Sequence, residues 1–494
     1  MRFALSLALL LALCLTGTAP AQPAADSACN YYRIENIPVP KGLLAEVGGL
    51  DFTPDGRLVA SFHRGEVMTY QPATKEWKVF AEGLHDPLGL VARDNGEILV
   101  MQRPELTRLR DTDGDGRADQ YETITDQFGL SGNYHEFNFG PVPDGNGDSF
   151  VSFNLASGLG GTFSEVRGTF DSLGRPGRMY SCVPYRGWVM KVDRQGNLTP
   201  WAMGFRSPNG LGFDGQGNLY VSDNQGDWLG TSKLYHVQQG KFYGHPSSLV
   251  WKEGFPDVDP LTVPPAKLDE MRTEAAVLFP HGIMANSPTQ PVCDTTGGKF
   301  GPFAGQLLVG EMNQHRILRV MLETVDGQVQ GACVPFFDNC GLRLGNNRMV
   351  FGPDGSLWVG QNNHEAWTGD EGLQRITWTG NVPMEVQEMH LTKKGFELVF
   401  TRPVDPKRAA DPAAYAFKHY YYHYHEAYGS KQFGVQPVPV KKVKVSPDGR
   451  RVTLQLDALK TGYVYELDVK GVQSAEGKPV LNPLVCYTLN RLKK

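Results

Sequence analysis

Residues 204–227 read GFRSPNGLGFDGQGNLYVSDNQGD, and this stretch contains the pattern from which the fold is predicted. Residues 211–213 form a short apolar strand, residues 214–218 are a turn rich in Gly and Asp, and residues 219–221 return as a second apolar strand. The second strand leads into the polar segment 222–226, which offers oxygen ligands where loops usually carry chemistry. The stretch therefore predicts a β-hairpin with a candidate site at the end of its second strand.

The same pattern of an apolar strand, a turn of Asp, Gly and Pro, and a second apolar strand recurs along the chain. Its copies lie at residues 50–60, 89–100, 137–151, 209–221, 303–309 and 349–359, the fifth being the least clear. Hairpins repeated at such intervals are typical of radial folds, which protect sheet edges without forming a closed barrel. We predict an all-β protein in which residues 30–378 form a six-bladed β-propeller. A pair of β-sandwiches with unrelated hairpins is the alternative.

The character of the sequence changes after Trp378. Residues 385–400 read as a strand, a charged turn and a strand, residues 441–459 read as another hairpin, and residues 463–469 alternate as a half-buried strand should. We therefore expect a second, smaller domain at residues 380–491, a β-sandwich of the immunoglobulin or fibronectin kind.

The composition is that of a soluble globular protein with more than one domain. The chain has 494 residues, of which 40% are hydrophobic and 20% charged, and its 57 Gly and 34 Pro favour many short strands joined by tight turns. The net charge is -5, and no Lys/Arg cluster is interleaved with aromatic residues, so we expect no nucleic-acid partner. Beyond the N-terminus, no apolar run is long enough to span a membrane.

Residues 1–21 are predicted to be a secretory signal peptide, with Arg2, an apolar run over residues 3–15 and an A-x-A cleavage site. Leu13 precedes Cys14, where a lipoprotein signal would have a small residue, so we expect a secreted or periplasmic protein without a lipid anchor. The cysteines that remain are an even set, for which disulfides are expected in an oxidising compartment. They are Cys29, Cys182, Cys293, Cys333, Cys340 and Cys486. Cys333 and Cys340 are the best pair by proximity, but the sequence does not fix the pairing.

Residues 111–122 read DTDGDGRADQYE and match a calcium-binding loop. The match requires oxygen ligands at fixed spacing, because each must reach one hard cation from a tightly curled backbone. The expected ligands are the side chains of Asp111, Asp113, Asp115, Asp119 and Glu122 and the carbonyl group of Arg117. No helical periodicity flanks the loop, so its calcium ion would be structural. The alternative is a solvated acidic turn.

His135 lies just before the first strand of a repeat, where propeller blades direct side chains toward one mouth of the axis. A histidine there can act as a general base near neutral pH, although a hydrogen-bonded structural histidine is the alternative. His281 and His315 have the same ambiguity. Arg206 and Arg348 also lie just before first strands, so they are expected either to enter the same mouth and attract an anion or to form salt bridges between blades.

Three segments, residues 204–213, 219–226 and 240–246, resemble the soluble quinoprotein glucose/sorbosone dehydrogenases. The resemblance covers about residues 40–375 and implies a six-bladed propeller with pyrroloquinoline quinone (PQQ) over its axis. It implies that Arg206 pins the quinone, that His135 takes the proton from a sugar or polyol hydroxyl, and that Arg348 binds the cofactor carboxylates. It also implies a calcium ion near residues 223–226 and a periplasmic electron acceptor. The propeller followed by a small sandwich further resembles the large secreted propeller proteins of planctomycete-type bacteria.

Two positions depart from the dehydrogenase pattern. Ser207 stands where the family has Asn after the arginine, and the cofactor-binding lysine expected after the strand at residues 306–310 is replaced by the run from Asn313 to Arg316. The loss of the lysine removes a positive charge from a pocket for a tricarboxylate. His315 or Arg316 could restore that charge or leave it missing, and Asn313 and His315 are the residues of the run expected to bind the cofactor.

Two other functions compete with the dehydrogenase. Residues 208–211 and 219–223 are similar to gluconolactonase-type propellers, which implies that Asn209 and Asp223 hold a divalent cation, with Glu46 or Glu136 as a third ligand. A non-catalytic propeller that binds carbohydrate or protein is the third interpretation. The tyrosine- and histidine-rich run at residues 418–426 would place His419, Tyr421, His423 and His425 on one face of a strand and Tyr420, Tyr422 and Tyr424 on the other. His423 and His425 could share a metal, the tyrosines could stack on sugar rings, or the run could be an aromatic core with its histidines at the solvent face.

Overall fold

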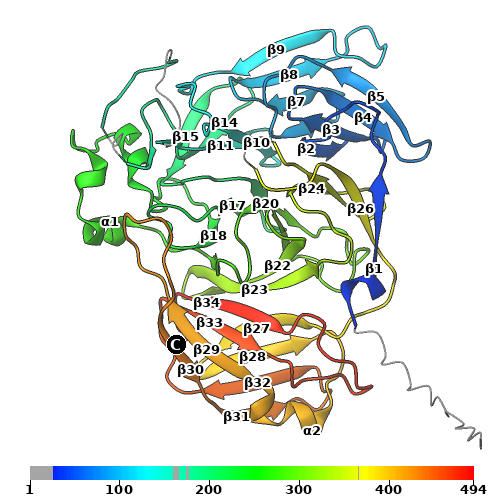
Figure 1. The fold of residues 1–494 in the computed structure, drawn as a ribbon, viewed down its shortest axis with the longest axis vertical. Helices are drawn as coiled ribbons and strands as arrows, with labels where there is room; N and C mark the ends of the chain where they lie inside the picture. Colours follow the sequence, from blue (N-terminus) through cyan, green and yellow to red (C-terminus); the bar gives the residue numbers. More distant parts are fainter. Residues whose placement is uncertain (1–25, 159–165, 174–176, 365–366) are drawn as a thin grey trace, which may run out of the picture.

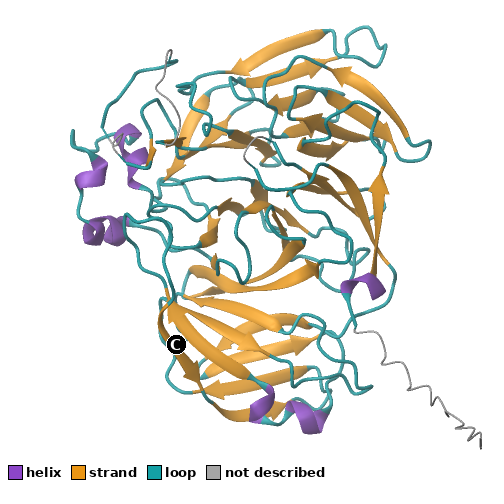
Figure 2. Cartoon of the chain, viewed as in Figure 1, coloured by secondary structure: helices purple, strands orange, loops and turns teal. Residues whose placement is uncertain are grey.

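The computed structural model describes residues 26–158, 166–173, 177–364 and 367–494 (Figure 1). The predicted signal peptide, residues 1–21, lies outside the described residues. Within the described ranges, strands dominate, and the short helices lie at the edge of the propeller and at the far end of the C-terminal unit (Figure 2). They are η1 (Ala28–Asn30), η2 (Pro246–Trp251), η3 (Pro260–Thr262), α1 (Pro265–Met271), α2 (Pro406–Ala409) and η4 (Pro412–Ala414).

The first three blades are four-stranded antiparallel sheets. Blade one contains β2 (Val47–Phe52), β3 (Leu58–Phe62), β4 (Val67–Gln71) and β5 (Glu76–Ala81). Blade two contains β6 (Leu90–Ala92), β7 (Ile98–Met101), β8 (Leu106–Arg110) and β9 (Gln120–Thr125). Blade three contains β10 (Asn138–Pro143), β11 (Ser149–Phe153), β14 (Trp188–Val192) and β15 (Leu198–Met203), with the small hairpin β12 (Ala156–Ser157) and β13 (Met179–Tyr180) inserted.

The other three blades follow the same plan. Blade four contains β16 (Leu211–Phe213), β17 (Leu219–Asp223), β18 (Ser232–His236) and β19 (Val277–Phe279). Blade five contains β20 (Pro288–Cys293), β21 (Leu307–Glu311), β22 (Arg316–Val325) and β23 (Gln328–Asp338). Blade six contains β24 (Asn346–Phe351), β25 (Leu357–Gln361), β26 (Gly372–Trp378) and the N-terminal strand β1 (Tyr32–Ile37).

The six blades form a closed ring. The first strand of each blade contacts the first strands of both neighbours, in the order β2, β6, β10, β16, β20, β24 and back to β2. Two segments that are far apart in the sequence close the ring. Strand β1 pairs with β26 along its whole length, from Tyr32 opposite Trp378 to Ile37 opposite Leu373 (Figure 1). The prediction of an all-β fold with a six-bladed propeller followed by a β-sandwich is confirmed.

In blades three and four, an aspartate at the start of the turn organises the backbone of the hairpin. The Asp214 Oδ1 atom accepts hydrogen bonds from the backbone N–H groups of Gln216 at 2.8 Å and Asn218 at 2.9 Å. Asp193 and Asp144 make the equivalent bonds in blade three. A side chain that replaces the missing backbone partners makes a tight turn favourable, which is why the Asp- and Gly-rich repeats predict hairpins.

Glycine lets the inner strands approach closely. A Cβ atom on Gly89, at the start of blade two, would lie 2.0 Å from the carbonyl oxygen of Gly140 in blade three. A Cβ atom on Gly212 in blade four would lie 2.0 Å from the carbonyl oxygen of Pro291 in blade five. The backbones of adjacent blades therefore touch at these positions, and no side chain fits between them.

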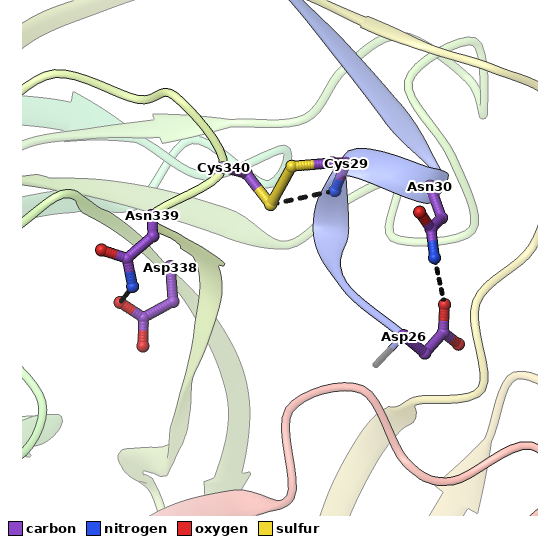
Figure 3. The surroundings of a disulfide bond; sticks show 6 residues. All are labelled: Asp26, Cys29, Asn30, Asp338, Asn339 and Cys340. Atoms are coloured by element: carbon purple, nitrogen blue, oxygen red, sulfur yellow. Dashed lines mark hydrogen bonds between the residues drawn. A yellow bond between two sulfur atoms is a disulfide. The ribbon is translucent and has the colours of Figure 1, made fainter. Parts of the chain in front are cut away.

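A disulfide links Cys29, beside β1, to Cys340, just after β23, with their Cα atoms 5.4 Å apart (Figure 3). The bond joins the N-terminal segment to blade five across 311 residues of sequence. The preference for a bond between Cys333 and Cys340 is therefore wrong. Cys333 lies within β23, where its cross-strand partner is Cys486, and its side chain is buried.

The C-terminal unit consists of two packed sheets. Strands β34 (Leu484–Leu489), β33 (Tyr463–Asp468), β29 (Ala416–Tyr421) and β30 (Phe433–Val438) continue the sheet of blade five beyond β23, so that eight strands form one sheet. Strands β27 (Val386–Thr392), β28 (Gly395–Phe400), β32 (Arg451–Leu456) and β31 (Val440–Val445) form the second sheet. An apolar core that includes Phe396, Tyr465 and Tyr487 separates them. The boundary at residue 380 and the immunoglobulin or fibronectin kind stay predictions.

The histidine-rich run does not form one long strand. Strand β29 ends at Tyr421, and residues 422–430 leave the sandwich as a loop that reaches the propeller. His419 is buried beside Tyr463 and Tyr465, so the expectation that it lies on the solvent face is wrong. Among the described residues, the search for long apolar helices finds none that could cross a membrane.

Replacing Gly89 with Ala should destabilise the ring. The new methyl group must displace the Gly140 carbonyl, so we expect a loss of about 1–3 kcal/mol in the free energy of unfolding, measured by urea denaturation. Gly215→Ala is the control, because the nearest atom to its added Cβ is the Cys293 sulfur at 4.0 Å. Equal stabilities for the two variants would contradict the close approach of the blades.

Candidate functional site

A cavity of about 250 Å³ opens at one end of the ring. The residues that line it precede the first strand of a blade or follow the second, as Asn209 precedes β16 and Asn224 follows β17. These positions face the same end in every blade, so the fold gathers residues that are far apart in sequence. Five predicted site residues line the cavity: His135, Arg206, Ser207, Asn209 and Asn313.

The hydrogen bonds of His135 fix its tautomer. Its Nδ1 atom lies 2.8 Å from the carbonyl oxygen of Leu155, and because a carbonyl only accepts, Nδ1 must carry the proton. The backbone N–H of His135 donates to Asn133 Oδ1 at 3.0 Å and fixes the loop. Burial, and secondly the charge of Arg206, lower the pKa of His135 to about 3. The ring is therefore neutral at pH 7, with a lone pair on Nε2.

Asp223 holds the loop that carries Arg206 and Ser207. Its carboxylate is buried and accepts hydrogen bonds from the backbone N–H groups of Arg206 at 3.0 Å and Ser207 at 2.7 Å. Burial raises the pKa of Asp223 above its ordinary value. Both of its oxygens accept from this backbone and so hold the loop in place.

Arg206 extends from this loop to the edge of the cavity. Its Nε atom is buried without a hydrogen-bond partner among the described residues, and its guanidinium lies 5.8 Å from the ring centre of Tyr428. Tyr428 belongs to the loop that comes from the C-terminal unit, and Arg178 covers the same ring at 4.1 Å. The positive charge of the Arg206 guanidinium lies beside the cavity, where it would attract an anionic ligand.

Arg348 lies beneath the cavity and connects several blades. It is 4% exposed, and its Nη1 atom donates to Asn209 Oδ1 at 3.1 Å and to Asn347 Oδ1 at 3.0 Å. Its Nη2 atom donates to the carbonyl oxygen of Leu88 at 2.9 Å. Burial lowers the pKa of Arg348 to about 9. It supports the cavity floor through Asn209, whose amide oxygen is thereby already bound.

Other predicted residues do not line the cavity. The His315 Nδ1 atom pairs with the Leu342 carbonyl at 2.7 Å, and Arg316 pairs with Asp338 at 2.8 Å. Glu136 accepts from the backbone and hydroxyl of Ser131. Glu46 pairs with Arg64 at 3.1 Å and His364 at 2.9 Å, and His281 is exposed on another loop. Of residues 313–316, Asn313 lines the cavity, while His315 and Arg316 have these other partners.

The predicted calcium loop lies between β8 and β9 on the outside of blade two. Asp111, Asp113 and Asp115 have carboxylate oxygens within 4.8 Å of one another. Asp119 instead accepts from Thr112, whose hydroxyl lies 2.6 Å away. Glu122 pairs with Arg108 at 3.1 Å and Arg110 at 3.2 Å, and the Arg117 side chain pairs with Glu82. The loop thus gathers three of its carboxylates, while those of Asp119 and Glu122 have other partners.

A buried pair of histidines near the cavity was not predicted. His63 follows β3 and His364 follows β25, and their rings stack with centroids 3.7 Å apart. Asp86 lies 3.7 Å from His63 and 2.7 Å from Arg103, whose Nη1 atom donates to the Tyr134 carbonyl beside His135. Ring-nitrogen lone pairs lie in the ring plane, so two stacked rings cannot both aim at one cation. We therefore read this group as a brace for the His135 loop.

Sequence position could have revealed these residues. His63, Asn154, Asn224 and Asn362 each follow the second strand of a blade, the same place from which the 222–226 segment was singled out. The aromatic walls Phe137 and Trp367, with ring centroids 5.1 Å apart, carry no such signal, because apolar residues in loops are common.

One family model matches more than half of the chain. A family model described as "Domain of unknown function (DUF7133)" matches residues 73–361. No curated protein matches the chain.

Three solved structures are similar to about 70% of the chain. The soluble aldose sugar dehydrogenase of Escherichia coli, in its apo form, is 15% identical with a TM-score of 0.45, and the match covers 70% of this chain and 99% of that one. The PQQ-bound aldose sugar dehydrogenase of Streptomyces coelicolor is 14% identical with a TM-score of 0.44, and the match covers 70% of this chain and 98% of that one. The PQQ domain of the pyranose dehydrogenase of Coprinopsis cinerea is 14% identical with a TM-score of 0.47, and the match covers 72% of this chain and 99% of that one. With TM-scores below 0.5, these similarities support no statement about the activity of this chain.

Replacing Asp223 with Asn should destabilise the protein. An amide has one acceptor oxygen, so its NH₂ group would face one of the two backbone donors, at a cost of about 1–3 kcal/mol in unfolding free energy. Asp214→Asn is the control, because both backbone N–H groups bound by Asp214 go to Oδ1, which an asparagine retains. Denaturant titration should show the larger loss for Asp223→Asn, and equal losses would contradict the role assigned to this carboxylate.

Proposed function

The chain belongs to the DUF7133 family, whose function is unknown, and from this premise we propose that it is an exported dehydrogenase that oxidises a sugar or polyol at a quinone cofactor of the PQQ kind. The observation that carries the proposal is one cavity that contains a neutral histidine with a free Nε2 lone pair and a positively charged arginine. A base and an anion-binding cation side by side are what alcohol oxidation at an anionic cofactor needs.

The residues of the cavity fit an aromatic, anionic cofactor. The charges of Arg206, Arg103 and Arg178 all act to lower the pKa of His135, so the neighbourhood is cationic. Phe137 and Trp367 supply flat apolar walls, and about 250 Å³ is close to the smaller cavities that hold cofactors. Arg206, Ser207 and Asn313 would hold the cofactor. When bound, the quinone would supply the acceptor for the two electrons of the substrate.

His135 would act as the general base. Its Nε2 atom would take the proton of the substrate hydroxyl as the alcohol is oxidised to a carbonyl. The Leu155 carbonyl keeps the Nδ1 proton in place and stabilises the imidazolium that forms. Arg206 opposes that charge, so an anionic ligand that neutralises Arg206 makes His135 a stronger base.

We also propose that the protein is exported, contains calcium and passes its electrons to a periplasmic acceptor. The Cys29–Cys340 disulfide suits an oxidising compartment. We propose that the cluster of Asp111, Asp113 and Asp115 binds a structural calcium ion.

The other two functions have less support. In a lactonase-type hydrolase Asn209 and Asp223 would hold a divalent cation, but Asn209 Oδ1 accepts from Arg348 and both oxygens of Asp223 accept from backbone N–H groups. A non-catalytic propeller that binds carbohydrate or protein would need no base, and gives no reason for the fixed tautomer of His135.

The full chain, supplied with PQQ and calcium, should reduce a dye at the expense of aldoses. His135→Gln should lower kcat about 10²- to 10⁴-fold without weakening quinone binding, because only the proton acceptor is lost. His281→Gln, in an exposed loop away from the cavity, should retain full activity.

Two results would reject this function. Absence of both quinone binding and dye reduction would select the binding protein. Hydrolysis of a lactone that depends on a divalent ion, and is abolished by Asn209→Ala with the fold intact, would select the hydrolase.

Calcium should raise the melting temperature of the full chain, and the chelator EGTA should reverse the effect. Asp113→Asn should reduce the calcium-dependent shift, because it removes one of three gathered carboxylates. Asp448→Asn, in an exposed turn of the sandwich, should leave the shift unchanged. A shift of equal size in both variants would place the ion elsewhere.

A further inference from the structure

A second pocket, of about 100 Å³, lies where the propeller meets the C-terminal unit. Lys233 of β18 and Arg272 supply its propeller side, and Tyr422, His423 and Tyr424 supply its other side. These three residues belong to the loop that follows β29, drawn in orange where it rises from the sandwich toward α1 (Figure 1). The pocket is separate from the cavity that contains His135.

Lys233 is buried in this pocket, its amine 5.9 Å from the ring centre of Tyr235, with the carboxylates of Asp223 and Asp269 near enough to act on its charge but not in an ion pair with it among the described residues. It is 6% exposed, and within the described ranges its amine makes no hydrogen bond and no ion pair. Asp223 is its cross-strand neighbour, but both Asp223 oxygens accept from the backbone of Arg206 and Ser207. Burial, and secondly Arg272, lower the pKa of Lys233 to about 7. An isolated ammonium in such a place is unfavourable unless an anion accompanies it.

The remaining charges around the pocket are already paired. Arg272 Nε donates to Asp269 at 2.8 Å, and Glu274 pairs with Arg491 at 2.8 Å. Among the described residues around the pocket, Lys233 is therefore the cation without an ion-pair partner. A volume of about 100 Å³ would hold roughly three water molecules at about 30 Å³ each, or one small oxoanion.

We propose that Lys233 is the centre of a binding site for a small oxoanion, a phosphate or carboxylate group, at the junction of the propeller and the C-terminal unit. This site goes beyond the proposed oxidation and does not depend on it. An anion held here would lie against the loop of residues 422–430, which reaches from the C-terminal unit to the propeller. That loop is already docked by hydrogen bonds from Gly429 N to the Gly226 carbonyl and from Ser430 N to the Gly230 carbonyl, each 2.8 Å long.

Isothermal titration of the full chain, in a buffer free of phosphate and carboxylate, tests the site with inorganic phosphate in one arm and acetate in the other. We expect saturable binding of at least one of them, and at least a tenfold loss of affinity in Lys233→Met, which keeps the apolar stem and removes the charge. Lys441→Met, an exposed lysine on β31, should bind as the wild type does. The stronger arm identifies the anion. Absence of binding in both arms, or equal affinity in Lys233→Met, would overturn the proposal.

A second measurement uses the unmodified sequence, in case Lys233→Met fails to fold. Reductive methylation of the full chain, followed by peptide mass spectrometry, reports how fast each lysine reacts. The anion that binds should slow the labelling of Lys233 several-fold and leave Lys441 unchanged at matched ionic strength. Equal slowing of both lysines, or of neither, would overturn the site whatever the outcome of the dehydrogenase assay.

Discussion

The backbone ladder between β1 and β26 holds the ring closed, and the rest of the molecule depends on it. Strand β1 begins at Tyr32 and β26 ends at Trp378, so the hydrogen bonds join the two ends of the propeller sequence. The Cys29–Cys340 disulfide fastens the same segment to blade five. Only a closed ring brings His135, Arg206 and Asn313 to one mouth, since each comes from a loop at the end of a different pair of strands. The geometry of the site is therefore a property of the whole ring.

Charge at the axis follows from burial. Arg348 is surrounded by carbonyl and amide oxygens without a carboxylate partner, so it fixes the floor while adding positive potential beneath the cavity. His135, above it, is kept neutral by burial and by Arg206. The cavity thus combines a cationic environment with an uncharged base, which favours a ligand that carries its own negative charge.

The fold could largely be predicted because Asp- and Gly-rich turns between apolar strands indicate β-hairpins. The copies at residues 50–60, 89–100, 137–151, 209–221 and 349–359 coincide with the first two strands of their blades. The fifth was indistinct because a long connection separates β20 from β21. At the site, position before or after a strand predicted that His135 and Arg206 would share one cavity, as they do, whereas spacing alone could not show that Glu122 has arginine partners on a neighbouring strand. Trp367 and the Cys29–Cys340 pair depend on long-range packing, which local patterns do not contain.

The eight-stranded sheet gives the C-terminal unit a protective task. Strand β23 would otherwise be the outermost strand of blade five, with unpaired backbone N–H and C=O groups along its free edge. Pairing of Gly331, Ala332 and Cys333 with β34 occupies that edge. A fragment cut after Trp378 would keep its ring but would expose the edge of β23, and exposed sheet edges pair with strands of other molecules. The propeller of this chain therefore depends on the C-terminal unit for its solubility.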